Sequence, residues 1–287
     1  MGRLGLVLNI LRPPLLLIPI GSFLMGIMWI DYVIIVNYET IVGIAVIILV
    51  SVMSFSLNSL IDAKDTDRLD RSSRFGYTNP VLIKPSLSSM LKVLNFTSAL
   101  AAILLSSSVS VFFLTLASAS ITLSVSYSYW PRFKARAPWD LISNILGFFI
   151  IPFCGGWSMR MPVCEIPLYY ILGISLISVS VCIMVSAIDY AADKGAELRT
   201  TVVVLGISKA LKMGALCLVL GVAIVWRDVV YDPLAIYIIP LIAASIMYSA
   251  VKPERVRKGL IMCAFIASLY ILLLFTLSFL KITPSPQ

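Results

Sequence analysis

Nine long apolar runs determine what this chain can fold into. They cover roughly residues 9–29, 39–60, 89–107, 109–128, 138–157, 167–190, 202–226, 233–250 and 258–280. A helix needs about 20 mostly apolar residues to cross the hydrocarbon core of a bilayer. Since 60% of the 287 residues are apolar and only 13% are charged, a soluble domain is excluded. The sequence predicts an all-α fold, in which residues 1–287 form a single polytopic membrane domain of about nine transmembrane helices.

Several classes of function are excluded by what the chain lacks. The first apolar run has no small-residue cleavage site, so we expect it to be a retained span and not a signal peptide. The chain has no histidine, which rules out Ser-His and Cys-His catalysis and most zinc sites. Its five cysteines lie in or beside apolar runs without a CxxC motif, so they resemble small apolar residues more than a disulfide framework.

The basic residues are distributed unevenly between the two sides of the predicted membrane domain. The side of the N-terminus, with the loops 61–88, 129–137, 191–201 and 251–257, holds 19 of the 22 Lys and Arg residues. The positive-inside rule therefore predicts a cell-membrane protein whose N-terminus and basic loops are cytoplasmic. The same rule explains the net charge of +8, so we expect no nucleic-acid partner.

An acidic cluster follows the second predicted span directly. Residues 58–70 read Asn-Ser-Leu-Ile-Asp-Ala-Lys-Asp-Thr-Asp-Arg-Leu-Asp. Asn58, Asp62 and Asp65 are spaced i, i+4 and i+7, so they would share one face if the helix continued. Oxygen ligands at a membrane boundary suit a hard cation such as Mg²⁺, while a solvated, charge-balanced loop is the simpler alternative. Asn58 favours a site, because polar residues at membrane depth are costly and tend to line functional cavities.

A second acidic pair, Asp189 and Asp193, closes the sixth predicted span with the same i, i+4 spacing. An ordinary helix end is the alternative, since Lys194 would favour the helix dipole and Gly195 would cap the helix. Both acidic clusters lie on the basic side of the membrane. We therefore expect them to form one site that holds a shared Mg²⁺–diphosphate group at its two ends.

The connection after the fourth span is rich in basic and aromatic residues. Residues 127–136 read Tyr-Ser-Tyr-Trp-Pro-Arg-Phe-Lys-Ala-Arg. Arg132 and Lys134 could neutralise phosphate, and the ring of Tyr127 could face a developing cation. The alternative is an aromatic belt with positive-inside anchors. The further candidate phosphate contacts are Arg12, Lys84, Lys194 and Arg199.

These motifs resemble those of the UbiA family of intramembrane prenyltransferases. Asn58-xxx-Asp62 with Thr66-Asp67-Arg68 is similar to the family's first aspartate-rich motif. Asp189-xxx-Asp193, followed by Gly195 and Arg199-Thr200, is similar to the second. The segment from Tyr127 to Lys134 matches the one after the fourth span, and Arg12-Pro13 matches the start of the first span.

The chain departs from the family pattern in two places. The family's next aspartate falls at the position of Thr66, with Asp65 and Asp67 on either side, so either of these could be the metal ligand. The usual Arg-Pro-Leu/Ile-Pro-Ser-Gly run is replaced by residues 79–86, Asn-Pro-Val-Leu-Ile-Lys-Pro-Ser. The second departure leaves the acceptor open.

The resemblance implies helices around a central cavity that opens sideways to lipid. It implies an enzyme that moves a polyprenyl group from its diphosphate, held through Mg²⁺ or Mn²⁺, to a lipophilic acceptor in lipid or quinone biosynthesis. The acceptor would be an aromatic quinone precursor, a polyprenoid such as a carotenoid, or a glycerolipid. The alternative function is a secondary transporter with intramembrane carboxylates, which would place its acids near the midplane and not at helix ends.

Overall fold

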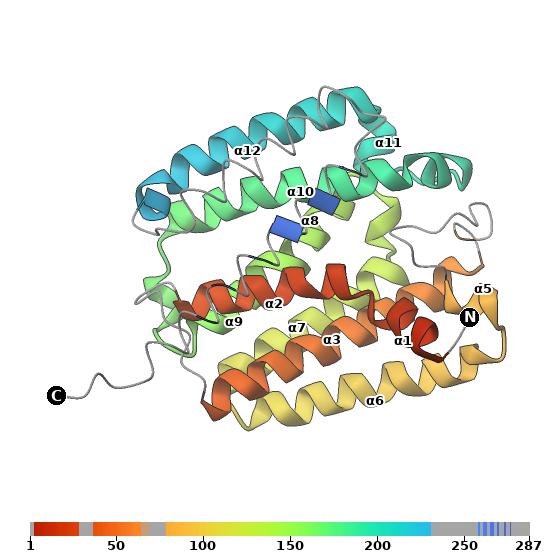
Figure 1. Cartoon of the computed structure of the whole chain (residues 1–287), viewed down its shortest axis with the longest axis horizontal. Helices are drawn as coiled ribbons and strands as arrows, with labels where there is room; N and C mark the ends of the chain where they lie inside the picture. Colours follow the sequence, from red (N-terminus) through yellow and green to blue (C-terminus); the bar gives the residue numbers. More distant parts are fainter. Residues whose placement is uncertain are drawn as a thin grey trace.

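The computed structural model describes residues 3–28, 37–64, 67 and 79–230, and isolated positions between 258 and 276 (Figure 1). Within these residues the chain forms helices and no strand, with one isolated β-bridge between two loops. The all-α prediction is therefore confirmed.

Six helical stretches are long and apolar enough to cross a membrane. They are α3 (Tyr38–Asp62), α6 (Leu87–Ser107), α7 (Val111–Ser128), the stretch Trp139–Trp157, α10 (Leu168–Gly195) and the Ile207–Trp226 part of α12 (Ile207–Val230). Each coincides with one of the predicted spans. The last two predicted spans, 233–250 and 258–280, lie outside the described residues apart from the isolated positions.

The first predicted span, 9–29, is not one continuous helix. The chain makes two helices there, α1 (Arg3–Leu11) and α2 (Pro13–Met28), and Arg12 between them has a φ of +46°. The two prolines that follow Arg12 explain the break, because a residue before proline is pushed out of the α region and proline donates no backbone hydrogen bond. The seventh span likewise starts late, since Gly206, with a φ of +77°, separates the short α11 (Thr201–Leu205) from α12.

The fifth span is not a uniform α-helix. It consists of α8 (Trp139–Ile145), a π-helical turn (Leu146–Ile150) and α9 (Ile151–Trp157). π-Turns inside α-helices are rare and frequent at functional sites, and the hydropathy pattern carries no signal for one.

The helices pack in two groups. α10 lies along α12, whereas α3 packs against α6 and α7, and α2 packs against α9 between the two groups (Figure 1). α2 and α9 can cross closely because a Cβ atom at Gly156 would lie 1.9 Å from the Phe23 carbonyl oxygen. In membranes such small residues bring backbones together, since packing and not a hydrophobic driving force associates the helices.

The end of α3, the end of α7, the start of α8 and the end of α10 meet at one end of the molecule. The loop between α7 and α8 contains a short 3₁₀ turn, Phe133–Ala135, and it pairs with the loop that follows α10. Ala137 N–H donates to the Arg199 carbonyl at 2.7 Å, and Arg199 N–H donates to the Ala135 carbonyl at 3.2 Å. This pairing fixes the basic loop to the loop that follows the second acidic motif.

Candidate active site

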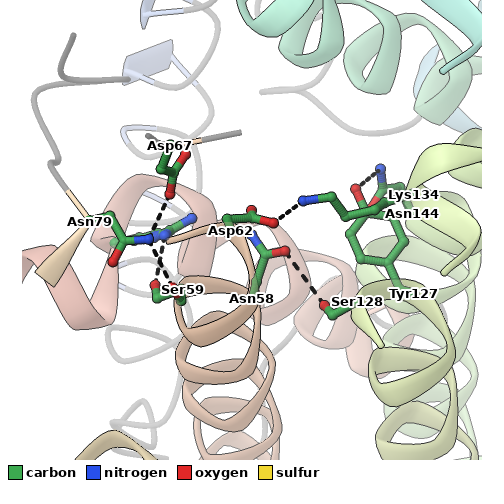
Figure 2. Close-up of polar contacts among 10 residues, drawn as sticks. Asn58, Ser59, Asp62, Asp67, Asn79, Tyr127, Ser128, Lys134 and Asn144 are labelled. Carbon is green, nitrogen blue, oxygen red and sulfur yellow. Dashed lines mark hydrogen bonds and ion pairs between the residues drawn. The ribbon is translucent and has the colours of Figure 1, made fainter. Parts of the chain in front are cut away.

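The carboxylate of Asp62 forms a buried ion pair with the ammonium of Lys134 (Figure 2). Asp62 is the last residue of α3, and Lys134 belongs to the turn Phe133–Ala135. Neither charge is left without a partner, as burial in a low-dielectric interior requires. Two residues that the sequence offered as separate candidates, one acidic and one basic, are therefore direct partners.

Asn58 lies one helical turn before Asp62 and contacts α7. The Ser128 hydroxyl donates to Asn58 Oδ1 at 3.5 Å (Figure 2). α3 ends at Asp62, and residues 63–64 form a turn. Asn58 and Asp62 therefore share one face of α3, as expected. Asp65, the third residue expected on that face, lies outside the described residues.

Hydrogen bonds of Asn79 link Asp67 to the end of α3. Asn79 Nδ2 donates to Asp67 Oδ2 at 2.7 Å and to the Ser59 carbonyl oxygen at 2.9 Å (Figure 2). The same Asn79 caps the short α5 (Pro80–Ile83), because its Oδ1 accepts from Val81 N–H at 2.9 Å. Asp67 and Asn79 are both buried. In the sequence analysis Asn79 was only the first residue of the segment that departs from the family pattern, not a residue of the site.

Arg12 points toward α3 and not along the membrane surface. Its Nη2 donates to the Ser59 hydroxyl at 3.0 Å, and its guanidinium carbon lies 5.8 Å from the centre of the Phe55 ring. Phe55 and Ser59 stand one turn apart on α3, next to Asn58 and Asp62. The break between α1 and α2 thus places a positive charge beside the acidic end of α3.

Tyr127, near the end of α7, is linked to the fifth span by a hydrogen bond. Its hydroxyl accepts a hydrogen bond from Asn144 Nδ2 at 3.3 Å (Figure 2). The charges of Asp62, Asp140 and Asp193 all act on this phenol. The first acidic motif, on α3, and the second, on α10, are therefore both within electrostatic range of the same side chain.

Asp140, which the sequence analysis did not single out, links the start of α8 to the start of α11. Its Oδ2 accepts from Thr201 N–H at 2.8 Å and its Oδ1 accepts from the Thr201 hydroxyl at 2.5 Å. Asp140 is buried in the first turn of α8, and Asn144 follows one turn later on the same face. Their i, i+4 spacing repeats that of Asn58 with Asp62 and of Asp189 with Asp193, but by itself it is a weak signal.

The other residues that the sequence analysis proposed for the site differ in how far they are buried. Asp193 is buried and Asp189 is half-buried near the end of α10. Lys194 is exposed, and its ammonium lies 5.8 Å from the centre of the Tyr190 ring. Lys84 and Arg199 are exposed, and Arg132 is half-buried with a φ of +63°. Trp130 is 77% exposed, as an interfacial aromatic residue would be.

The oxygen ligands fit a hard cation that also binds its substrate. Among the described residues, no three acidic, cysteine or histidine side chains converge to form a complete metal cage. Mg²⁺ does not require one, because it is usually bound through one or two carboxylates plus substrate phosphates. Asp62, which already has a cationic partner, and Asp193 are the residues that could hold it from the two motifs.

Comparison with known proteins identifies the fold and the family. A sequence model described as the UbiA prenyltransferase family matches residues 19–280. No curated protein sequence matches the chain.

Solved structures of UbiA homologues have the same fold at low sequence identity. A homologue from Archaeoglobus fulgidus bound to DMAPP and Mg²⁺ has a TM-score of 0.72 and 21% identity, covering 94% of this chain and 98% of that one. An apo homologue from Aeropyrum pernix K1 has a TM-score of 0.70 and 15% identity, covering 92% and 98%. A digeranylgeranylglyceryl phosphate synthase has a TM-score of 0.63 and 15% identity, covering 98% and 100%. Because the family match spans most of its length, the chain belongs to the UbiA prenyltransferase family.

Proposed function

We propose that this protein transfers a polyprenyl group from its diphosphate to a lipophilic acceptor inside the membrane. One observation carries the proposal: Asp62, at the end of α3, forms a buried ion pair with Lys134 from the basic loop after α7. The Archaeoglobus fulgidus homologue was solved with DMAPP and Mg²⁺ and also with GPP and Mg²⁺, which supports a prenyl diphosphate and a divalent cation here.

The residues have distinct roles in this reaction. Asp62 and Asp193, with Asn58, Asp189 and either Asp65 or Asp67, would hold Mg²⁺, with Mn²⁺ as the alternative, and the cation would neutralise the departing diphosphate. Lys134, which pairs with Asp62, and Arg12, which donates to Ser59 in the last turn of α3, would contact the same diphosphate.

The ionisation itself needs no nucleophilic side chain. The allylic carbon–oxygen bond breaks when charge on the leaving diphosphate is neutralised, and preorganised cations do this best where water is excluded. The ring of Tyr127 can stabilise the resulting carbocation, and Asn144 holds the phenol in place. The acceptor, whether an aromatic quinone precursor, a polyprenoid or a glycerolipid, captures the cation and loses a proton.

The transporter alternative finds less support. Coupling carboxylates of secondary transporters lie near the bilayer midplane at broken helices. Here Asp62 is the last residue of α3, and Asp193 lies within the last turn of α10.

Labelled geranylgeranyl diphosphate tests the proposal. The purified protein in lipid nanodiscs is incubated with this donor, Mg²⁺ and a membrane lipid extract, and labelled lipids are identified by mass spectrometry. We expect a new prenylated lipid with wild-type protein and with Glu39→Gln, which changes an acid at the opposite end of α3. Asp62→Asn should give none. If no variant yields product with any extract, or if Asp62→Asn is as active as wild type, the proposal is wrong.

A further inference from the structure

The first two turns of α8 connect helices from both groups of the fold. Asp140, in the first turn, accepts from the N–H and the hydroxyl of Thr201 at the start of α11, at 2.8 and 2.5 Å. Asn144, one turn later, donates to the Tyr127 hydroxyl near the end of α7. α11 packs against α10 and α12, whereas α7 packs against α3 and α6. The start of α8 is therefore hydrogen-bonded to both groups at the end of the molecule where the acidic motifs lie.

The carboxyl group of Asp140 does more than cap a helix. The first N–H groups of a helix have no partner within it, and the residue before the helix normally accepts from one of them. α11 has such a cap already, since the Thr200 hydroxyl accepts from Val203 N–H at 3.4 Å. Asp140 comes from 61 positions away in the chain, and Asp140 and Thr201 are only 3% and 7% exposed. This buried contact, the Asp140–Thr201 clasp, therefore holds two distant segments together.

The clasp lies beside the backbone pairing of the two loops. Arg136, in the loop before α8, and Arg199, in the loop after α10, form the isolated parallel bridge. Asp140 N–H donates to the Arg136 carbonyl at 3.1 Å, so the residue that holds Thr201 is also bonded to one side of the bridge. Thr201 lies two positions after Arg199, on the other side. The bridge and the clasp therefore join the two loops at adjacent points.

Each loop is attached to one of the two acidic motifs. Lys134, in the loop before α8, pairs with Asp62 of the first motif. Leu198, in the loop after α10, donates its N–H to the Asp193 carbonyl of the second motif at 2.9 Å. A movement of one loop away from the other would therefore change the spacing between Lys134 and Asp193.

We propose that Asp140 is a positioning residue, which through the clasp holds the two acidic motifs at the spacing that one cation–diphosphate group requires. Asp140 need not touch the substrate for this role, because both of its carboxylate oxygens accept from Thr201. A site that is already held in its binding geometry avoids the free-energy cost of ordering its loops when the ligand binds. The inference rests on the proposed function, since it assumes that Asp62 and Asp193 share one cation–diphosphate.

Three variants change the clasp to different degrees. Asp140→Asn turns one acceptor oxygen into an NH₂ donor that faces the donors of Thr201. Thr201→Val removes the hydroxyl at nearly constant shape, and Thr201→Ser keeps it. The affinity for geranylgeranyl thiolodiphosphate, a donor analogue that does not ionise, is measured by calorimetry in nanodiscs with Mg²⁺. Asp140→Asn and Thr201→Val should each weaken it about tenfold, the scale of one buried hydrogen bond, whereas Thr201→Ser should stay within about threefold of wild type.

A helix cap far from the site provides the control for loss of stability. The Ser110 hydroxyl accepts from Phe113 N–H at 3.0 Å at the start of α7, the end of that helix opposite to Tyr127. Ser110→Ala should lower the Tm, as loss of a cap does, without changing the affinity for the analogue. The double variant Asp140→Asn/Thr201→Val should bind about as weakly as either single variant, because both changes break the same contact.

A covalent link between the loops should replace the clasp. Neighbouring strands lie about 4.8 Å apart, within the range of about 4.4–6.8 Å between the Cα atoms of a disulfide. Arg136→Cys and Arg199→Cys, in a background without native cysteines, can therefore be joined across the bridge. When this protein also carries Asp140→Asn, oxidation should strengthen binding of the analogue about tenfold relative to the reduced form. When Asp140 is retained, oxidation should change the affinity less than about threefold.

The outcomes distinguish this inference from the proposed function. Failure of wild type to bind the analogue with Mg²⁺ would overturn both. Wild-type affinity in Asp140→Asn and Thr201→Val, an equal loss in Ser110→Ala, or a disulfide that does not strengthen binding in the presence of Asp140→Asn would overturn the positioning role and leave the transferase intact. If proteins with Asp140→Asn do not fold, weak binding by Thr201→Val with recovery in Thr201→Ser supports the inference, and equal affinity of these two variants rejects it.

Discussion

Replacing Lys134 by methionine would leave the buried Asp62 carboxylate without its ammonium partner. The side chains of Lys134 and Asp62 are only 9% and 3% exposed, so water cannot take the place of the lost charge. Removing one member of a buried ion pair costs about 3–5 kcal/mol, mostly as the penalty of the charge that remains. Methionine keeps most of the apolar stem of lysine, so little of the loss comes from packing.

Thermal unfolding in nanodiscs, with and without Mg²⁺, measures this effect. At about 2–4 °C per kcal/mol, the loss corresponds to a fall in Tm on the order of 10 °C for Lys134→Met. Mg²⁺ should recover part of the fall, because the freed carboxylate accepts a divalent cation and binding to the folded state stabilises it. Lys92→Met is the matched control, since Lys92 is exposed on α6.

Two results would refute this reasoning. One is a Tm for Lys134→Met, in the absence of divalent cations, that equals the Tm of Lys92→Met. The other is an equal response of the two variants to Mg²⁺. Either result would mean that Lys134 does not neutralise a buried carboxylate at the cation site.

Three further predictions concern the site and the membrane orientation. Excess EDTA should abolish transfer, and Mg²⁺ or Mn²⁺ should restore it; full activity in EDTA would reject the metal site. Asp140→Asn should weaken binding of a Mg²⁺–thiolodiphosphate about tenfold, because it loosens the hydrogen bonds between Asp140 and Thr201. Glu165→Gln, beyond the other end of the fifth span, is the control and should leave the affinity unchanged; equal affinities of the two variants would contradict a positioning role for Asp140. In a background without native cysteines, an impermeant thiol reagent should label Ser107→Cys but not Ser86→Cys in intact cells, and the reverse pattern would reject the orientation. Ser86 and Ser107 are exposed at opposite ends of α6.

Hydropathy predicted the spans well for two reasons. The hydrocarbon core of the bilayer has a fixed thickness, and a chain that crosses it must form all its backbone hydrogen bonds within the protein, as a helix does. α3, α6, α7 and α10 therefore lie close to their predicted positions. The break at Arg12 is a local backbone effect of the following prolines, and it was predictable in principle. The π-turn in the fifth span has no pattern of its own, because it depends on packing between neighbouring helices.

The sequence predicted which residues belong to the candidate site better than it predicted the contacts between them. Asp62 and Lys134 were singled out separately by charge and position, but their pairing depends on how α3 meets the loop after α7. Asp140 was missed because a lone carboxylate at a helix start resembles an ordinary first-turn acid. Its spacing to Asn144 is a weak signal that becomes informative only once the contacts of Asp140 with Thr201 and of Asn144 with Tyr127 are known.

The central claim is that the two acidic motifs form one site, although Asp62 and Asp193 come from different helices. Turnover of Asp62→Asn, Asp193→Asn and the double variant with geranylgeranyl diphosphate and Mg²⁺ tests it most directly. Groups that act as a unit are strongly non-additive, so each single variant should lose nearly all turnover and the double variant should be little worse than either. Near-normal turnover of Asp193→Asn, or a double variant whose loss equals the product of the single losses, would contradict the single site.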